Sequence, residues 1–208
     1  MTVKLSDEIR SVPNDQAFDT MVEETWADEG GFANLDGDPG GATRFGITEA
    51  VARKHGYTGD MKDLPQQVAL DIYRVSYYTG PGLDEVAARS YLIAQECFDA
   101  GVNIGPDRAG QMLQRALNLL NRRGKDWADL KPDGVVGEKT IDALTAALRK
   151  RGATAERNIL KALICQRGSY YMDLAAADEK FESFLNGWLD KRTDLERLAG
   201  YGVHTGSA

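Results

Sequence analysis

Apolar residues recur along most of this chain with the spacing of an α-helix, and one glycine-rich stretch interrupts that pattern. Phe18, Met21, Val22 and Trp26 fall at i, i+3, i+4 and i+8, which puts them on one face of a helix. Asn14 or Asp15 can cap this helix, and the pair Gly30-Gly31 ends it. Similar patterns return from residue 48 onward and predict about eight helices in all, in an all-α or α-dominated architecture.

The later helices are separated by turn-forming residues, which fix their expected limits. Pro106 suits the first turn of a helix, and residues 122–137 are polar and rich in turn residues. The helical segments are expected at residues 48–56, 64–78, 89–103, 106–121, 138–152, 154–174 and 179–198. Residues 89–103 are apolar on most sides, which indicates a buried central helix.

Charge and composition exclude several classes of protein. The 208 residues carry a formal net charge of −7, which argues against binding nucleic acid, because a phosphate backbone requires a basic patch. The same charge argues against tight adhesion to anionic membranes. No window approaches the roughly 20 apolar residues of a membrane span, and the first 18 residues lack the apolar core of a secretory signal. The expected protein is made in the cytoplasm without a Sec signal, and its two cysteines are expected to be free thiols.

The glycine-rich stretch covers residues 26–48 and begins with a glutamate at the end of the first helix. Glu29 follows Phe18 by eleven residues, about three turns, and so lies on the inward-packing face. It meets the negative end of the helix dipole and lies close in sequence to Trp26 and Phe32. Both the dipole and partial burial are expected to raise the pKa of Glu29, as a general acid requires.

Two aspartates follow in the same loop, and they allow more than one interpretation. A carboxylic acid facing a carboxylate, here Asp36 or Asp38, is the arrangement used for glycoside hydrolysis. A capped helix followed by a solvated, turn-forming loop explains the same residues equally well. A calcium loop is the weaker alternative, because Ile47 stands where the bidentate glutamate of an EF-hand is needed.

Other polar and aromatic residues are candidates for a sugar cleft. Gln95, Asp99 and Asn103 form a polar stripe at i, i+4 and i+8 on the apolar central helix, which either lines a cleft or satisfies polar groups in the core. One of the three tyrosines Tyr73, Tyr77 and Tyr78 is expected to face the cleft. The two histidines have no zinc-site spacing, and no Ser-His-Asp or Cys-His arrangement is visible. We therefore expect no metal site and no cofactor.

The glycine-rich stretch resembles the signature of the glycoside hydrolase family 108 muramidases, which include phage endolysins and bacterial secretion activators. The motif is E-G-G-aromatic followed by D-P-G-G-x-T-x-x-G-I, and it appears here as residues 29–32 and 38–47. Phe32 replaces the commoner tyrosine. Residues 98–106 resemble a second family segment, F-D-x-x-V-N-x-G, and residues 132–144 are similar to a peptidoglycan-binding signature. The resemblance extends over residues 17–195.

This resemblance implies roles for particular residues. Glu29 matches the catalytic acid of the family. Asp38 has the phage-lysozyme spacing from it, and Thr43, one residue short of that spacing, would help to position the attacking water. Phe32, Tyr78, Asp99 and Asn103 are the expected substrate-binding residues. The implied fold is α+β, lysozyme-like and strongly helix-dominated, with a small loop or hairpin after the catalytic helix.

The resemblance also implies an organisation and an activity. Residues 14–105 would form the catalytic domain, residues 106–199 a helical peptidoglycan-binding region packed on it, and residues 200–208 a frayed tail. The expected protein is a monomeric muramidase that cleaves the β-1,4 bond between N-acetylmuramic acid and N-acetylglucosamine in the cell wall, after release by a holin or another export route. A lytic transglycosylase and a non-catalytic wall-binding module are the alternatives.

Overall fold

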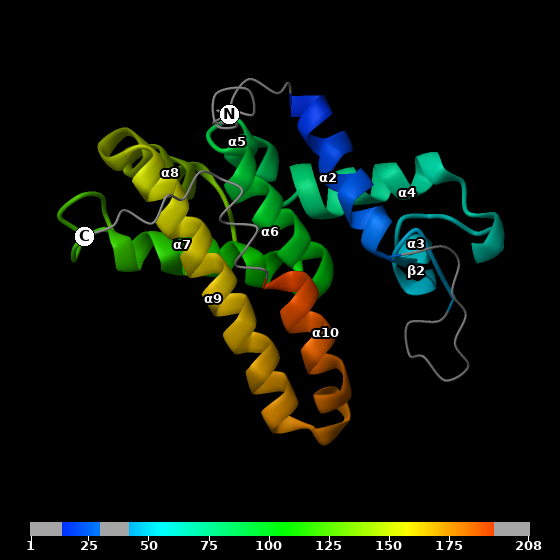
Figure 1. Cartoon of the computed structure of the whole chain (residues 1–208). Helices are drawn as coiled ribbons and strands as arrows, with labels where there is room; N and C mark the ends of the chain where they lie inside the picture. Colours follow the sequence, from blue (N-terminus) through cyan, green and yellow to red (C-terminus); the bar gives the residue numbers. More distant parts are fainter. Residues whose placement is uncertain (1–13, 30–41, 194–208) are drawn as a thin grey trace, which may run out of the picture.

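The computed structural model describes residues 14–29 and 42–193, with side chains for residues 15–26 and 42–193. The first helix, α2 (Asn14–Glu29), is followed by a two-stranded antiparallel sheet of β1 (Thr43–Arg44) and β2 (Ile47–Thr48). All the other elements of the described chain are helical. The α+β, helix-dominated architecture expected from the sequence is confirmed, including a small hairpin after the first helix (Figure 1).

The segment after the hairpin contains short helices around one irregular turn. These are α3 (Glu49–Lys54), the 3-10 turn η1 (Met61–Asp63), α4 (Gln66–Tyr73), the π-helix η2 (Arg74–Thr79) and α5 (Leu83–Ala87). The single helix expected over residues 64–78 therefore divides into an α-helix and a π-helix. α5 is an additional short helix after the Gly-Pro-Gly turn. Gly82 precedes it with φ +79°, a conformation that glycine adopts without a steric penalty.

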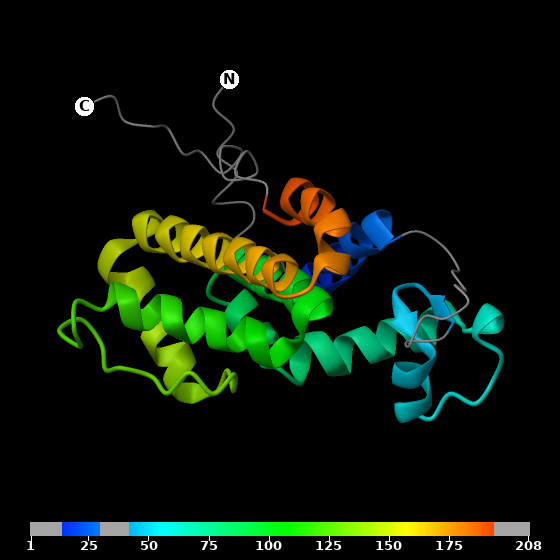
Figure 2. The same ribbon diagram turned by 90° about the horizontal axis from the view of Figure 1, so that it is seen from below.

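Longer helices form the rest of the molecule. They are α6 (Tyr91–Ile104), α7 (Pro106–Leu120), α8 (Glu138–Arg151), α9 (Ala153–Ala177) and α10 (Glu182–Arg192), with the 3-10 turn η3 (Glu179–Phe181) before the last. Helix α6 lies in the middle of the molecule and packs against α2, α5, α7 and α9 (Figures 1 and 2). Eleven of its 14 residues are buried, as expected for the central helix.

The polar segment between α7 and α8, residues 121–137, packs against the core through close backbone contacts. A Cβ at Gly110 would lie 2.2 Å from the carbonyl oxygen of Gly134, so both positions need glycine for the chains to approach. The buried Gln114 amide donates to the carbonyl of Val135 at 3.0 Å. Trp127 is buried, and its indole N–H donates to the carbonyl of Leu117. This connection is thus an ordered part of the fold.

Candidate functional site

The end of α2 and the hairpin meet through aromatic side chains. The rings of Trp26, on the last turns of α2, and Phe45, in the hairpin turn, lie 5.2 Å apart. Tyr73 of α4 has its ring 6.1 Å from Trp26, and its hydroxyl donates to the carbonyl of Phe45 at 3.1 Å. These contacts hold the C-terminal end of the first helix against the hairpin.

The hairpin turn is tight and holds a residue in a strained conformation. Its two central residues, Phe45 and Gly46, have φ values of 52° and 71°, as in the type I′ turns that join two-residue hairpins. Glycine adopts this conformation freely, whereas a phenylalanine there costs roughly 1–2 kcal/mol. The contacts of Phe45 with Trp26 and Tyr73 offset that cost. Strain of this kind is concentrated at functional sites.

The structure brings two of the three expected catalytic positions to this junction. Glu29 is the last residue of α2, one turn beyond Trp26, and Thr43 begins β1, two residues before Phe45. Thr43 pairs with Thr48 across the hairpin. The side chain of Glu29 and the residues Phe32 and Asp38 lie outside the described part of the chain.

The polar stripe of α6 faces two different neighbours. Gln95 is buried and donates a short hydrogen bond to the carboxylate of Glu24 on α2. Asn103 is exposed, and its side-chain oxygen accepts a hydrogen bond of 2.6 Å from the hydroxyl of Tyr171 on α9. The stripe therefore connects the central helix with both the first helix and α9.

Asp99, the middle residue of the stripe, lies in a cluster of ion pairs. Its carboxylate contacts Arg167 of α9 and Arg192 of α10, each at 2.5 Å. Arg167 is 2% exposed and also pairs with Glu96 at 3.3 Å. Sequence reasoning missed Arg167, because residues 159–171 also contain Lys161, Gln166 and Ser169 and give no sign that this arginine is buried. The cluster joins α6, α9 and α10.

Tyr78 lies in the hydrophobic core, at 1% exposure. Its ring is 5.3 Å from Phe18 and 6.4 Å from Phe98. Burial raises the pKa of its hydroxyl to about 12, so the group stays neutral at physiological pH. In this structure Tyr78 packs the first helix against the central one.

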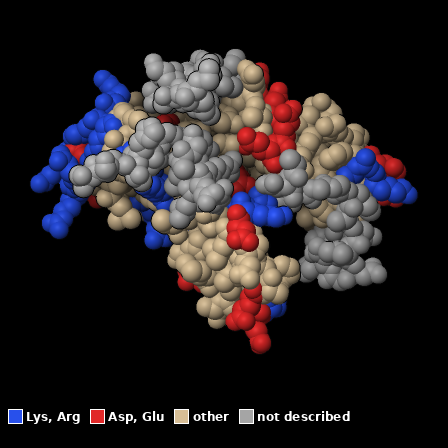
Figure 3. All heavy atoms as spheres, in the orientation of Figure 1, with Lys and Arg blue, Asp and Glu red and all other residues tan. Residues whose placement is uncertain are grey.

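Positively charged side chains gather at the end of the molecule away from the hairpin. Figure 3 shows basic side chains at the end of the molecule formed by α8 and the connection before it. Asp126 lies among these cations, bonded to Arg122, Lys150 and Arg151. Over the described residues, no group of three or more His, Cys, Asp or Glu side chains has the arrangement of a metal site. The same part of the chain has no helix long and apolar enough to span a bilayer.

Comparison with known families assigns both halves of the molecule. Residues 22–105, which include α2, the hairpin and α6, match the glycosyl hydrolase 108 family. This part of the chain is therefore a domain of the glycosyl hydrolase 108 family. Residues 108–193, from α7 to α10, match a domain described as a predicted peptidoglycan domain. This glycosyl hydrolase 108 protein is therefore a glycoside hydrolase directed at peptidoglycan.

A solved structure of the same shape supports the assignment of the fold. The structure of SagA from Brucella abortus superposes with a TM-score of 0.66 and is 26% identical in sequence. The alignment covers 93% of this chain and 99% of SagA. The family 108 domain and the peptidoglycan domain thus occur in this protein within a known overall arrangement.

Proposed function

We propose that this protein is a muramidase, which hydrolyses the β-1,4 bond between N-acetylmuramic acid and N-acetylglucosamine. The observation that carries the proposal is the contact between Trp26 and Phe45, because it joins the helix that ends in Glu29 to the hairpin that begins with Thr43. Hydrolysis of a glycosidic bond needs a proton donor and a group that directs the attacking water or stabilises the developing positive charge, and the end of α2 and the hairpin bring candidates for these roles together.

In the proposed mechanism Glu29 is the general acid and protonates the leaving oxygen of the glycosidic bond. The C-terminal end of α2 carries a partial negative charge, which favours the protonated carboxyl. Asp38 directs the attacking water or stabilises the positive charge that develops on the sugar, and the hydroxyl of Thr43 helps to orient that water. A proton donor and a separate carboxylate are the two groups that this reaction uses.

The proposed organisation follows the two family matches. Residues 14–105 form the catalytic domain and residues 106–199 the wall-binding region, with Gly105 between α6 and α7 as the boundary. The cluster of Arg167, Asp99 and Arg192 crosses this boundary, so the two parts are expected to act as one body. We further propose that the protein acts as a monomer on the cell wall after export by a holin or another route.

Mass spectrometry of digested sacculi tests the reaction. A muramidase releases muropeptides with reducing ends, and that is the expected result for the purified protein. Anhydro-muropeptides would show a lytic transglycosylase, in which no water is positioned. Recovery of undigested sacculi with bound protein would show a wall-binding module without activity. Either of the last two results overturns the proposal.

A further inference from the structure

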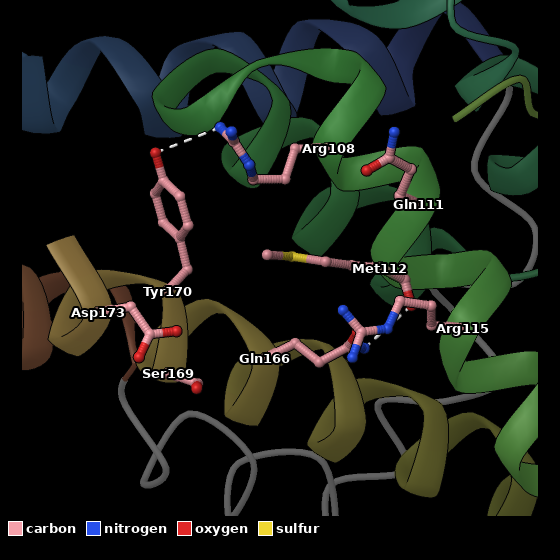
Figure 4. A pocket seen from close by; sticks show the side chains of 8 residues that line it. All are labelled: Arg108, Gln111, Met112, Arg115, Gln166, Ser169, Tyr170 and Asp173. Carbon is pink, nitrogen blue, oxygen red and sulfur yellow. Dashed lines mark hydrogen bonds between the residues drawn. The ribbon is translucent and has the colours of Figure 1, made fainter. Parts of the chain in front are cut away.

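A pocket of about 270 Å³ lies between α7 and α9, within the peptidoglycan domain and apart from the hairpin. Figure 4 shows the side chains that line it. Its volume is at the small end for ligand sites, so it suits one small group rather than a long glycan. The charged and polar side chains at its wall are Arg108, Gln111, Arg115, Gln166, Ser169, Tyr170 and Asp173.

One wall of the pocket is preorganised. The guanidinium of Arg108 lies 4.4 Å from the centre of the Tyr170 ring and donates to the Tyr170 hydroxyl at 3.2 Å. It also donates to the carbonyl of Ile104 at 2.8 Å. An arginine held in this way loses little side-chain entropy when it binds an anion.

Gln166 brings a buried acceptor to the pocket. Its amide nitrogen donates to the carbonyls of Met112 and Ala162 at 3.0 and 3.2 Å. Since carbonyls only accept, these contacts fix which end of the amide is nitrogen. The other end, Oε1, is buried and has no hydrogen-bond partner among the described residues. A buried acceptor left unpaired is unfavourable, and pairing with an N–H group of a ligand would remove that cost.

Arg115 and Asp173 bring two further charges to the pocket, and both side chains are exposed to solvent. Within the described chain, neither Arg115 nor Asp173 forms an ion pair or a hydrogen bond. Arg115 comes from α7, beside Gln166, whereas Asp173 comes from α9, beyond Ser169 (Figure 4). The pocket thus offers positive charge and negative charge at separate places, with an amide acceptor available as well.

We propose that this pocket binds the zwitterionic peptide of peptidoglycan rather than its sugars. A carboxylate of the peptide pairs with Arg115 and Arg108, an ammonium group pairs with Asp173, and a peptide N–H donates to Oε1 of Gln166. A neutral sugar would leave all three charges unmatched. This inference rests on the proposed function, because it assigns the part of the same polymer that the second domain recognises.

Calorimetry with peptides freed from sacculi by an amidase tests the pocket. The intact protein should bind the free peptides. Arg115→Gln and Asp173→Asn should each weaken binding at least tenfold, which is about 1.4 kcal/mol, because each removes one charge-assisted contact with the peptide. Arg149→Gln is the matched control, because Arg149 is an exposed arginine on α8 outside the pocket, and it should bind as the parent does.

Modified peptides identify which charge meets which residue. Esterification removes the carboxylate charge, so esterified peptides should bind the parent and Arg115→Gln with the same low affinity. Acetylation removes the ammonium charge, so N-acetylated peptides should bind the parent and Asp173→Asn with the same low affinity. The inference is overturned if the free peptides do not bind, or if the two pocket variants bind them as well as Arg149→Gln does. It is also overturned if each modification lowers the peptide affinity of the parent and of the matched variant by the same factor.

The two proposals fail in different ways. Loss of peptide binding with continued release of reducing muropeptides rejects the pocket and leaves the muramidase standing. Peptide binding without any muropeptide release rejects the muramidase and supports the pocket as a peptide site.

Discussion

The rings of Trp26 and Phe45 lie 5.2 Å apart and fasten the end of the first helix to the hairpin turn. Phe45 holds a strained backbone conformation there, with φ 52°. The contact therefore fixes the position of Thr43 relative to the last turn of α2, and changes to it should affect both stability and catalysis.

Removing either ring should lower the free energy of unfolding by more than the loss of buried apolar surface alone would. We expect Trp26→Leu and Phe45→Leu to show a coupling free energy of about 0.5–1.5 kcal/mol in a double-mutant cycle, the usual range for an aromatic pair. Urea unfolding measures the coupling, and muropeptide release should fall in both single variants. Phe184→Leu, at a half-exposed ring on α10, should keep full activity. A coupling near zero would show that the two rings are only neighbours.

Glu29→Gln should stop the reaction without unfolding the protein. Glutamine keeps the shape and hydrogen bonding of the side chain but cannot deliver a proton. Turnover should fall about a thousandfold, because general acid catalysis contributes roughly 10²–10⁴. Lysis rate, thermal midpoint and sacculus pull-down are measured together. Near-parental lysis would remove Glu29 from the mechanism, whereas unfolding would show a structural role.

Asp38 should matter more than Asp36. Asp38→Asn removes the carboxylate with the phage-lysozyme spacing and should reduce hydrolysis of purified peptidoglycan strongly. Asp36→Asn is the matched control, at a neighbouring carboxylate two residues earlier, and should have the smaller effect. The reverse order would assign the second carboxylate to Asp36.

Arg167→Met should destabilise the protein by about 3–5 kcal/mol, because it removes the buried cation that pairs with both Glu96 and Asp99. Denaturant unfolding gives the value. Arg149→Gln, at an exposed arginine, should change the free energy of unfolding by less than about 0.5 kcal/mol. If Arg167→Met is as stable as the parent, the cluster contributes nothing to holding α9 and α10 on α6.

The Asp126 carboxylate should make stability depend on pH. Hydrogen bonds from Arg122, and then from Lys150, hold the pKa of Asp126 well below its usual range. Its contribution is therefore present above the unfolded pKa of about 4 and is lost as pH falls toward the folded pKa. Thermal midpoints of the parent and Asp126→Asn should differ at pH 7 and converge in acid. A difference that stays constant down to pH 2 would contradict this.

The helical architecture was predictable from the sequence because it rests on local information. The spacing of Phe18, Met21, Val22 and Trp26 defines an inward face without reference to any other element. Helix α2 ends at Glu29, which directly precedes the glycine pair in the sequence, and Pro106 begins α7. The apolar pattern also predicted the helical character of residues 89–103, and the family resemblance implied a small loop or hairpin after the first helix.

The division of α4 from its π-helix was not predictable. Both parts have a helical apolar pattern, and only the structure shows that Tyr73 from α4 and Tyr78 from η2 both pack against Phe98. The polar stripe on α6 likewise left two interpretations open. Only the fold shows that Asp99 meets Arg167 and Arg192, which are distant in sequence.

The sequence by itself determined most of the helical segments and which motif carries the candidate acid, because propensity, periodicity and turn chemistry are properties of neighbouring residues. Tertiary structure alone decided that Trp26 meets Phe45, that Arg167 is a buried hub and that a charged pocket opens between α7 and α9. Such contacts depend on how helices cross, which is set by the packing of whole faces in three dimensions and leaves no signature at any single position.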